Sequence, residues 1–124
     1  MSIVYWIILA AIILFFLLRL RGGKGITSIT AEQLKTLLED KQNRKFIDVR
    51  EPAEYKGGHI AGMKNIPLAT VAKECANWDK NDEIIVMCRS GSRSMMAART
   101  LKRQGFTKVI NVRGGVMSWQ GKLS

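Results

Sequence analysis

The sequence is poor in the residue types that bind metals. Its 124 residues include two cysteines, Cys75 and Cys88, and a single histidine, His59, with no Cys-x-x-Cys pair. Structural zinc sites take three or four cysteine, histidine or carboxylate ligands at short spacings. We therefore expect no metal site and no other cofactor. About 100 residues outside the apolar N-terminus are enough to bury a core without disulfides.

Acidic residues are scarce as well, with 10 Asp and Glu against 20 Lys and Arg and a net charge of +10. Such an excess favours nucleic acid or anionic lipid as a partner when the basic residues cluster. Here they are scattered and are not interleaved with aromatic residues, so a nucleic-acid site is not expected. We interpret the excess charge of the domain as a solvated basic surface.

The first 18 residues contain no charged side chain. As a helix they would extend about 27 Å, close to the ~30 Å hydrocarbon core of a bilayer. Tyr5 and Trp6 suit one membrane interface, and Arg19 and Arg21 suit the other. No basic residue precedes the run and no small-residue cleavage site follows it, which disfavours a cleaved signal peptide. Residues 1–21 are therefore predicted to form a single transmembrane anchor, with the following domain facing the cytoplasm because the local positive charge lies after the span.

The rest of the chain has no internal repeat. Residues 22–25 are glycine-rich and predict a short linker, and residues 26–124 predict one domain. Short strand-like runs alternate with helical patterns throughout that domain, which is typical of an α/β fold with a mainly parallel sheet. Strands are expected near 26–30, 46–49, 63–66, 83–87 and 109–112. Helices are expected to begin at residue 30, to cover 51–55, 68–78 and 92–104, and to include a short last helix that ends at residue 119.

The strongest strand signal, at 83–87, runs directly into Cys88 and a tight loop. In an open α/β sheet, ligands bind at the carboxyl ends of strands, where this loop would lie. Inward backbone N–H groups, the N-terminus of the next helix and two arginines would favour an ionised thiol and an anionic substrate. Cys88 is therefore the predicted catalytic nucleophile, and the predicted substrate-binding residues are Arg89, Ser90, Gly91, Ser92 and Arg93.

Several other residues are candidates for supporting roles. Asp48 and Glu54 are candidate partners for Arg50 or for the loop arginines, with strand-end solvation or local capping as the alternative. His59 is interpreted as a structural hydrogen-bonding residue. Cys75 lies in a helical stretch and is interpreted as buried and inert.

Four ordered stretches resemble the motifs of the rhodanese-homology domain, a rhodanese-like family. They are Phe-Ile-Asp-Val-Arg-Glu-Pro-Ala-Glu-Tyr at 46–55, Gly-His-Ile-Ala-Gly-Met-Lys-Asn-Ile-Pro at 58–67, Cys-Arg-Ser-Gly-Ser-Arg-Ser at 88–94 and Val-Arg-Gly-Gly-Val-Met-Ser-Trp at 112–119. Met63 stands where alanine is usual. The resemblance covers residues 26 to about 123 and carries no information on the N-terminal helix. It implies a three-layer α/β/α fold with a five-stranded parallel sheet.

The resemblance also implies a sulfurtransferase that works by a ping-pong reaction. Cys88 would take the sulfane sulfur of thiosulfate or a persulfide donor and pass it to a thiol acceptor or to cyanide. Two alternatives stay open. One is a tethered binding or sulfur-relay module without turnover. The other is a phosphatase or arsenate reductase, which the short loop disfavours because those relatives place arginine one position later than Arg93.

Overall fold

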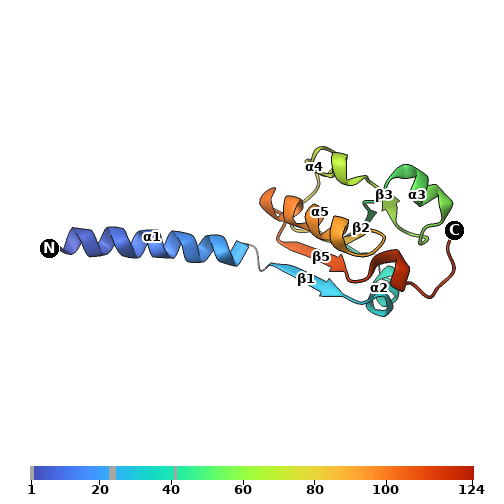
Figure 1. Cartoon of the computed structure of the whole chain (residues 1–124), viewed down its shortest axis with the longest axis horizontal. Coiled ribbons are helices and arrows are strands. Elements are labelled where there is room, and N and C mark those ends of the chain that lie inside the picture. Colours follow the sequence, from blue (N-terminus) through green and yellow to red (C-terminus); the bar gives the residue numbers. More distant parts are fainter. Residues whose placement is uncertain (1, 23–24, 41) are drawn as a thin grey trace.

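The computed structural model describes residues 2–22, 25–40 and 42–124, with the side chains of residues 18–22 outside the description. After an N-terminal helix, strands and helices alternate along the chain (Figure 1). The elements are α1 (Ile3–Gly22), β1 (Ile26–Ile29), α2 (Ala31–Leu38), β2 (Arg44–Asp48), α3 (Pro52–Gly57), β3 (Lys64–Asn65), η1 (Leu68–Thr70), α4 (Val71–Glu74), β4 (Glu83–Met87), α5 (Ser92–Arg103), β5 (Lys108–Val112) and η2 (Gly115–Ser118).

The sheet has five strands in the order β1-β5-β4-β2-β3, and every neighbouring pair is parallel. Strand β4 is central and has no exposed residue, as expected for an apolar strand covered on both faces. The predicted α/β class with a five-stranded parallel sheet is thereby confirmed. Because all strands run the same way, the residues that follow β1, β2, β4 and β5 meet at one edge of the sheet.

Two apolar clusters cover the two faces of the sheet. One joins Ile84 and Val86 of β4 to Ala97 and Leu101 of α5. The other joins the alternate residues Ile85 and Met87 to Leu34 of α2. The period of two along β4 thus divides its side chains between the α5 side and the α2 side. Packing on both faces holds the carboxyl end of β4, and the residue after it, in a fixed place.

Most predicted elements lie within a residue or two of their expected bounds. Helix α2 begins, as expected, just after Thr30, with a capping box in which the Thr30 and Gln33 side chains each accept the other's backbone N–H. The expected helix over 68–78 was wrong in length, because a 3₁₀ turn over 68–70 precedes a single α-helical turn that ends at Glu74. The following Asn and Asp residues favour turns, and the Asp79 carboxylate accepts the backbone N–H of Asn81 at 2.9 Å.

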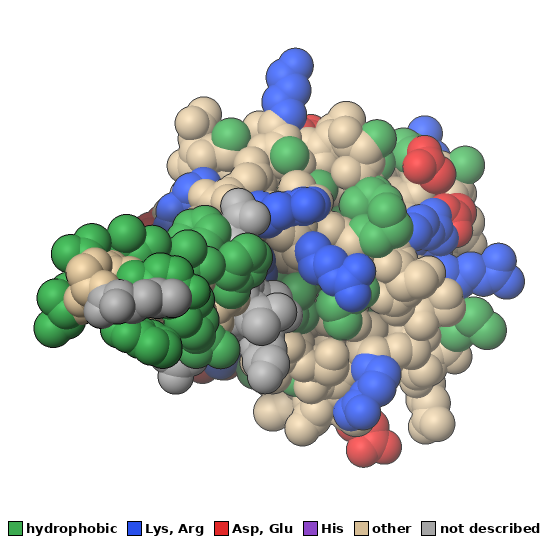
Figure 2. Space-filling model, turned by 60° about the vertical axis from the view of Figure 1, so that its left-hand side comes forward, with side chains coloured by type: hydrophobic (Ala, Val, Ile, Leu, Met, Phe, Trp, Pro, Cys, Tyr) green, Lys and Arg blue, Asp and Glu red, His purple; other side chains and the backbone are tan. Residues whose placement is uncertain are grey.

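Helix α1 stands apart from the sheet in Figure 1. Its apolar side chains over residues 3–17 are mostly exposed, and Figure 2 shows them as a continuous apolar surface. Among the residues described, no helix combines the length and apolar character needed to cross a bilayer, so the predicted transmembrane anchor is not supported. The predicted linker at 22–25 includes residues 23 and 24, which lie outside the described residues.

Candidate active site

Cys88 follows β4 directly and is 1% exposed. Its carbonyl oxygen accepts the backbone N–H of Val116 at 2.9 Å, and the carbonyl of Arg89 accepts that of Met117 at 3.0 Å. These bonds fasten the start of the loop to η2. Gly115 makes the approach possible, because a side-chain carbon there would collide with the carbonyl oxygens of Cys88 and Arg89. Its φ of 56° is also one that favours glycine.

The sulfur of Cys88 faces hydrogen-bond donors from the turn that follows it. The backbone N–H of Gly91 donates to Sγ at 3.0 Å, and the hydroxyl oxygen of Ser94 lies 3.4 Å from Sγ. Gly91 has a φ of 111°, a left-handed conformation that turns the chain into α5. The loop therefore curls back over the sulfur, so that backbone groups and one hydroxyl surround it.

This environment changes the acidity of the thiol. Burial alone would raise the pKa of Cys88, but hydrogen bonds from the Ser94 hydroxyl and from the amides of Ser94, Gly91 and Ser90 outweigh it. The pKa of Cys88 therefore lies below its ordinary value. Because the thiolate is the nucleophilic form of cysteine, the loop prepares this sulfur for attack on an electrophile.

Ser94 is itself held by a second buried polar residue. Its hydroxyl lies 2.5 Å from Asn111 Oδ1 and 3.0 Å from the carbonyl oxygen of Gly91. Ser94 is fully buried, and Asn111 on the adjacent strand β5 is 5% exposed. Neither residue was among the predicted site residues. A sequence signal existed for Asn111, because it is a polar residue inside the apolar run 109–112, and a buried amide needs a partner.

Arg93 is bound to Glu54 rather than directed at the sulfur. Two of its nitrogens donate to the two carboxylate oxygens of Glu54, at 2.6 and 2.8 Å. This bidentate pair lowers the pKa of Glu54 to about 2 and raises that of Arg93. The pair ties the first turn of α5 to α3. It therefore braces the loop from outside, which gives Glu54 the arginine partner that the sequence suggested.

Asp48 and Arg50 form a second, fully buried pair. Arg50 donates to the Asp48 carboxylate through Nε and through a terminal nitrogen at 2.8 Å, and it also donates to the carbonyl oxygen of Gly58. A buried arginine with this many acceptors fixes the turn from β2 into α3. No hydrogen bond or ion pair between described residues links this pair to Cys88, so its role is to shape the chain next to the site.

The remaining predicted loop residues lie at the surface. Arg89, Ser90 and Ser92 are exposed, and the Arg89 side chain forms no hydrogen bond or ion pair with any other described residue. An exposed, unpaired guanidinium beside the loop can attract an anion. The described residues contain no cluster of side chains suited to a metal ion.

The two other chemically reactive residues form no hydrogen bond with the sulfur of Cys88. His59 stacks on Tyr55 with ring centroids 3.8 Å apart, and its Nδ1 lies 2.9 Å from the Tyr55 carbonyl oxygen. Cys75 is fully buried, and burial raises its pKa to about 11. Both cysteines are free. These contacts give His59 a structural place and make Cys75 a poor nucleophile.

Similarity to known proteins identifies the family to which this fold and site belong. The model of the rhodanese-like domain matches residues 30–122, so the chain belongs to the rhodanese-like domain family. It is 46% identical over 101 residues to a putative sulfur carrier protein, YrkF, of Bacillus subtilis (strain 168), covering 82% of this chain and 55% of that one. It is 32% identical over 94 residues to a protein of Allochromatium vinosum named a sulfurtransferase, covering 76% of this chain and 88% of that one.

The fold has the same relatives among solved structures. A rhodanese-like domain protein from Staphylococcus aureus superposes with a TM-score of 0.70 at 31% identity, over 79% of this chain and 96% of that one. The chain spans about 55% of the length of the Bacillus subtilis relative YrkF.

Proposed function

We propose that this protein is a sulfurtransferase that carries sulfane sulfur on Cys88 as a persulfide. The observation that carries the proposal is the hydrogen-bonded sulfur at the carboxyl end of β4, whose pKa lies below the ordinary cysteine value. The family membership and the sulfurtransferase name of the Allochromatium vinosum relative support the same reaction class. Thiosulfate, or a persulfide of similar charge, is the proposed donor.

The first step is a displacement at sulfur. The Cys88 thiolate attacks the outer sulfur of thiosulfate, the sulfur–sulfur bond of the donor breaks, and sulfite leaves with the bonding electron pair. Cys88 then holds a persulfide whose negative charge rests on the outer sulfur. The backbone amides that favour the thiolate also suit this anion, because they donate hydrogen bonds to negative charge.

The second step returns the enzyme to its starting state. An acceptor thiolate or cyanide attacks the outer sulfur of the persulfide, and the sulfur–sulfur bond to Cys88 breaks. The acceptor leaves as a persulfide or as thiocyanate, and Cys88 is again a thiolate. No oxidant or reductant enters either step, which agrees with a site built from hydrogen-bond donors and cations.

Thiocyanate formation from thiosulfate and cyanide tests this proposal directly. The full chain, purified in a mild detergent, should turn over with ping-pong kinetics. Cys88→Ser should abolish turnover, because a serine hydroxyl is not ionised at neutral pH and cannot hold a sulfane sulfur. Cys75→Ala is the matched control, since Cys75 is buried at the C-terminal end of α4 and is not part of the loop, and it should keep the activity. Turnover by Cys88→Ser, or none by the wild type, would refute the proposal.

A relay role without small-molecule turnover is the second candidate, and the name of the Bacillus subtilis relative, a putative sulfur carrier protein, favours it. A relay module would take up sulfur from a donor but would not release it to cyanide. Uptake of sulfur on Cys88 without thiocyanate formation would therefore select this candidate. A phosphatase is not favoured by any contact in the site, and the loop holds its second arginine at position 93, where Glu54 binds it.

We also propose that α1 attaches the chain to a lipid bilayer, with the domain on the cytoplasmic side. The support is the exposed apolar surface of residues 3–17 and the basic residues that follow it in the sequence. Flotation with liposomes of neutral and anionic lipid tests this. The full chain should float with both, and a variant with Ile8 and Ile12 changed to lysine should float poorly. Recovery of the unmodified chain only in the lipid-free fraction would refute the attachment.

A further inference from the structure

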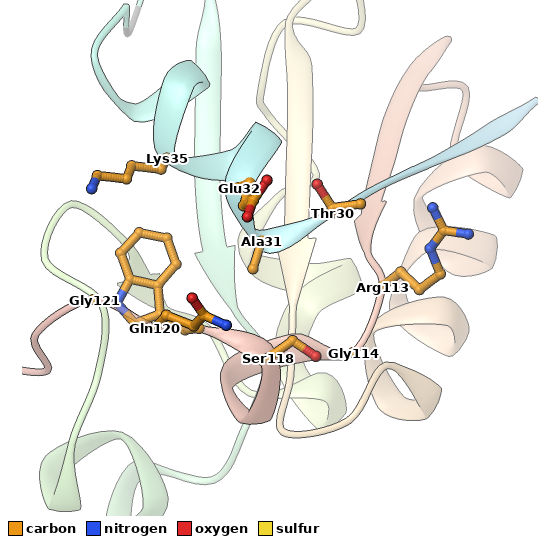
Figure 3. A pocket seen from close by; sticks show the side chains of 10 residues that line it. Thr30, Ala31, Glu32, Lys35, Arg113, Gly114, Ser118, Gln120 and Gly121 are labelled. Atoms are coloured by element: carbon orange, nitrogen blue, oxygen red, sulfur yellow. The ribbon is translucent and has the colours of Figure 1, made fainter.

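A cavity lies beside the loop that follows Cys88. It has a volume of about 830 Å³ and opens between the start of α2 and the segment after β5 (Figure 3). Residues from both elements line it, among them Glu32, Lys35, Arg113, Ser118, Trp119 and Gln120. Strand β5, which leads into the second of these segments, is next to β4 in the sheet, and β1, which leads into the first, is next to β5. The cavity therefore lies at the same edge of the sheet as Cys88, where the carboxyl ends of the strands meet.

Only one residue separates the wall of this cavity from the sulfur. Gly114 lines the cavity, and a side-chain carbon on Gly91 would lie 3.5 Å from the backbone nitrogen of Gly114. Gly91 in turn donates its N–H to Cys88 Sγ. A molecule bound in the cavity thus has its near end beside the loop that holds the reacting sulfur.

The size of the cavity does not suit the small reactants. Thiosulfate and cyanide are ions of a few atoms, whereas pockets of roughly 300 to 1,000 Å³ hold organic ligands. When thiosulfate is the donor, the reactant with an organic body is the acceptor thiol. The cavity is therefore better matched to the acceptor than to the donor.

The charged side chains that line the cavity indicate which kind of thiol it would bind. Figure 3 shows Lys35 and Arg113 on opposite sides, with Glu32 between them. All three side chains are exposed, and none forms a hydrogen bond or ion pair with another described residue. Two free cations and one free carboxylate complement a molecule that carries carboxylates and an ammonium group. Trp119 adds an aromatic surface against which a carbon chain can pack.

We propose that this cavity binds the body of the sulfur acceptor, a low-molecular-weight thiol of the amino-acid or small-peptide class. The inference rests on the proposed sulfurtransferase function and adds the recognition of the acceptor to it. Lys35 and Arg113 bind the carboxylates, Glu32 binds the ammonium group, and the thiol reaches toward the loop past Gly114. The acceptor thiolate then attacks the outer sulfur of the Cys88 persulfide, and Cys88 leaves as the thiolate.

Steady-state kinetics with several acceptors tests this on the full chain. Thiosulfate is the donor, and the acceptors are reduced glutathione, which has two carboxylates and an ammonium group, neutral 2-mercaptoethanol, and cyanide. The variants are Lys35→Met, Arg113→Met and their combination. Lys73→Met on α4 is the control, because it removes an equal charge from the opposite face of the sheet. The quantity compared is kcat/KM for glutathione divided by kcat/KM for cyanide.

We expect this ratio to fall about threefold in each single variant and about tenfold in the double variant, mainly through the KM for glutathione. The corresponding ratio for 2-mercaptoethanol should stay constant, as should both ratios in the control. Glu32→Gln should raise the KM for glutathione but not the KM for 3-mercaptopropionate, which has no ammonium group. An unchanged glutathione ratio in the double variant would overturn the inference, as would wild-type turnover with cyanide but none with glutathione. Absence of turnover with cyanide would instead refute the sulfurtransferase function itself.

Discussion

Removal of the Ser94 hydroxyl is the most informative single change at the sulfur. In Ser94→Ala the Gly91 amide still donates to Sγ at 3.0 Å, but the hydroxyl at 3.4 Å is gone. Hydrogen bonds to charged groups contribute about 1.5–3 kcal/mol, and the long sulfur contact places this one near the lower end. Since about 1.4 kcal/mol corresponds to a factor of ten, the thiolate population at neutral pH should fall roughly tenfold.

The sign of this effect fixes its pH dependence. Ser94 lowers the pKa of Cys88, so its loss raises that pKa and depletes the thiolate only where the thiol is partly protonated. The rate of alkylation by iodoacetamide, measured against pH by intact mass, should therefore be about tenfold slower at neutral pH in Ser94→Ala. The two proteins should reach the same rate at alkaline pH, where both are fully ionised.

A control is needed because Ser94 also contacts a buried amide. Its removal leaves Asn111 Oδ1 without that donor, which should cost about 1–3 kcal/mol of unfolding free energy. Urea unfolding of both proteins separates this loss of stability from the change in thiol acidity. Equal alkylation rates at every pH, in a folded variant, would refute the hydrogen-bond account of the site.

Three further changes probe the surroundings of the sulfur. Asn111→Asp should raise the pKa of Cys88, because a carboxylate would retain the Ser94 proton and add negative charge, and alkylation at neutral pH should slow accordingly. Glu54 has its pKa lowered from 4.5 to about 2 by Arg93, so its stabilisation is present above pH 4.5 and is lost as the pH falls through about 2. Wild type should therefore lose about 1 kcal/mol more on acidification than Glu54→Gln, measured by urea unfolding. Gly115→Ala should lower both Tm and sulfur transfer, because its side chain meets the carbonyl oxygens of Cys88 and Arg89; an unchanged Tm would contradict that steric argument.

The sequence was sufficient for the parts of the fold that depend on local patterns. The apolar run 83–87 predicted β4, and the small polar residues after Cys88 predicted a tight loop, because strand periodicity and turn chemistry are read over a few neighbouring residues. The same kind of local pattern predicted the helix from residue 30, which is α2. The number of strands came from the family resemblance, and their order came from the structure, since a single sequence does not state which strands are neighbours.

Contacts between distant segments could not be read in this way. Arg93 and Glu54 lie 39 residues apart, so only the packing of α3 against α5 shows that this arginine braces the loop and does not face the sulfur. The contact of Asn111 with Ser94 depends on β5 lying next to β4. In both cases the residue type suggested a polar partner, but the partner was set by the tertiary fold.

The central claim is that Cys88 holds a transferable sulfur atom, and intact mass spectrometry after incubation with thiosulfate tests it most directly. Following removal of excess donor, the wild type and Cys75→Ala should each gain the mass of one sulfur atom, and added cyanide should remove it. Cys88→Ser should gain nothing. An unmodified wild-type mass, or a sulfur adduct that persists in Cys88→Ser, would contradict the account.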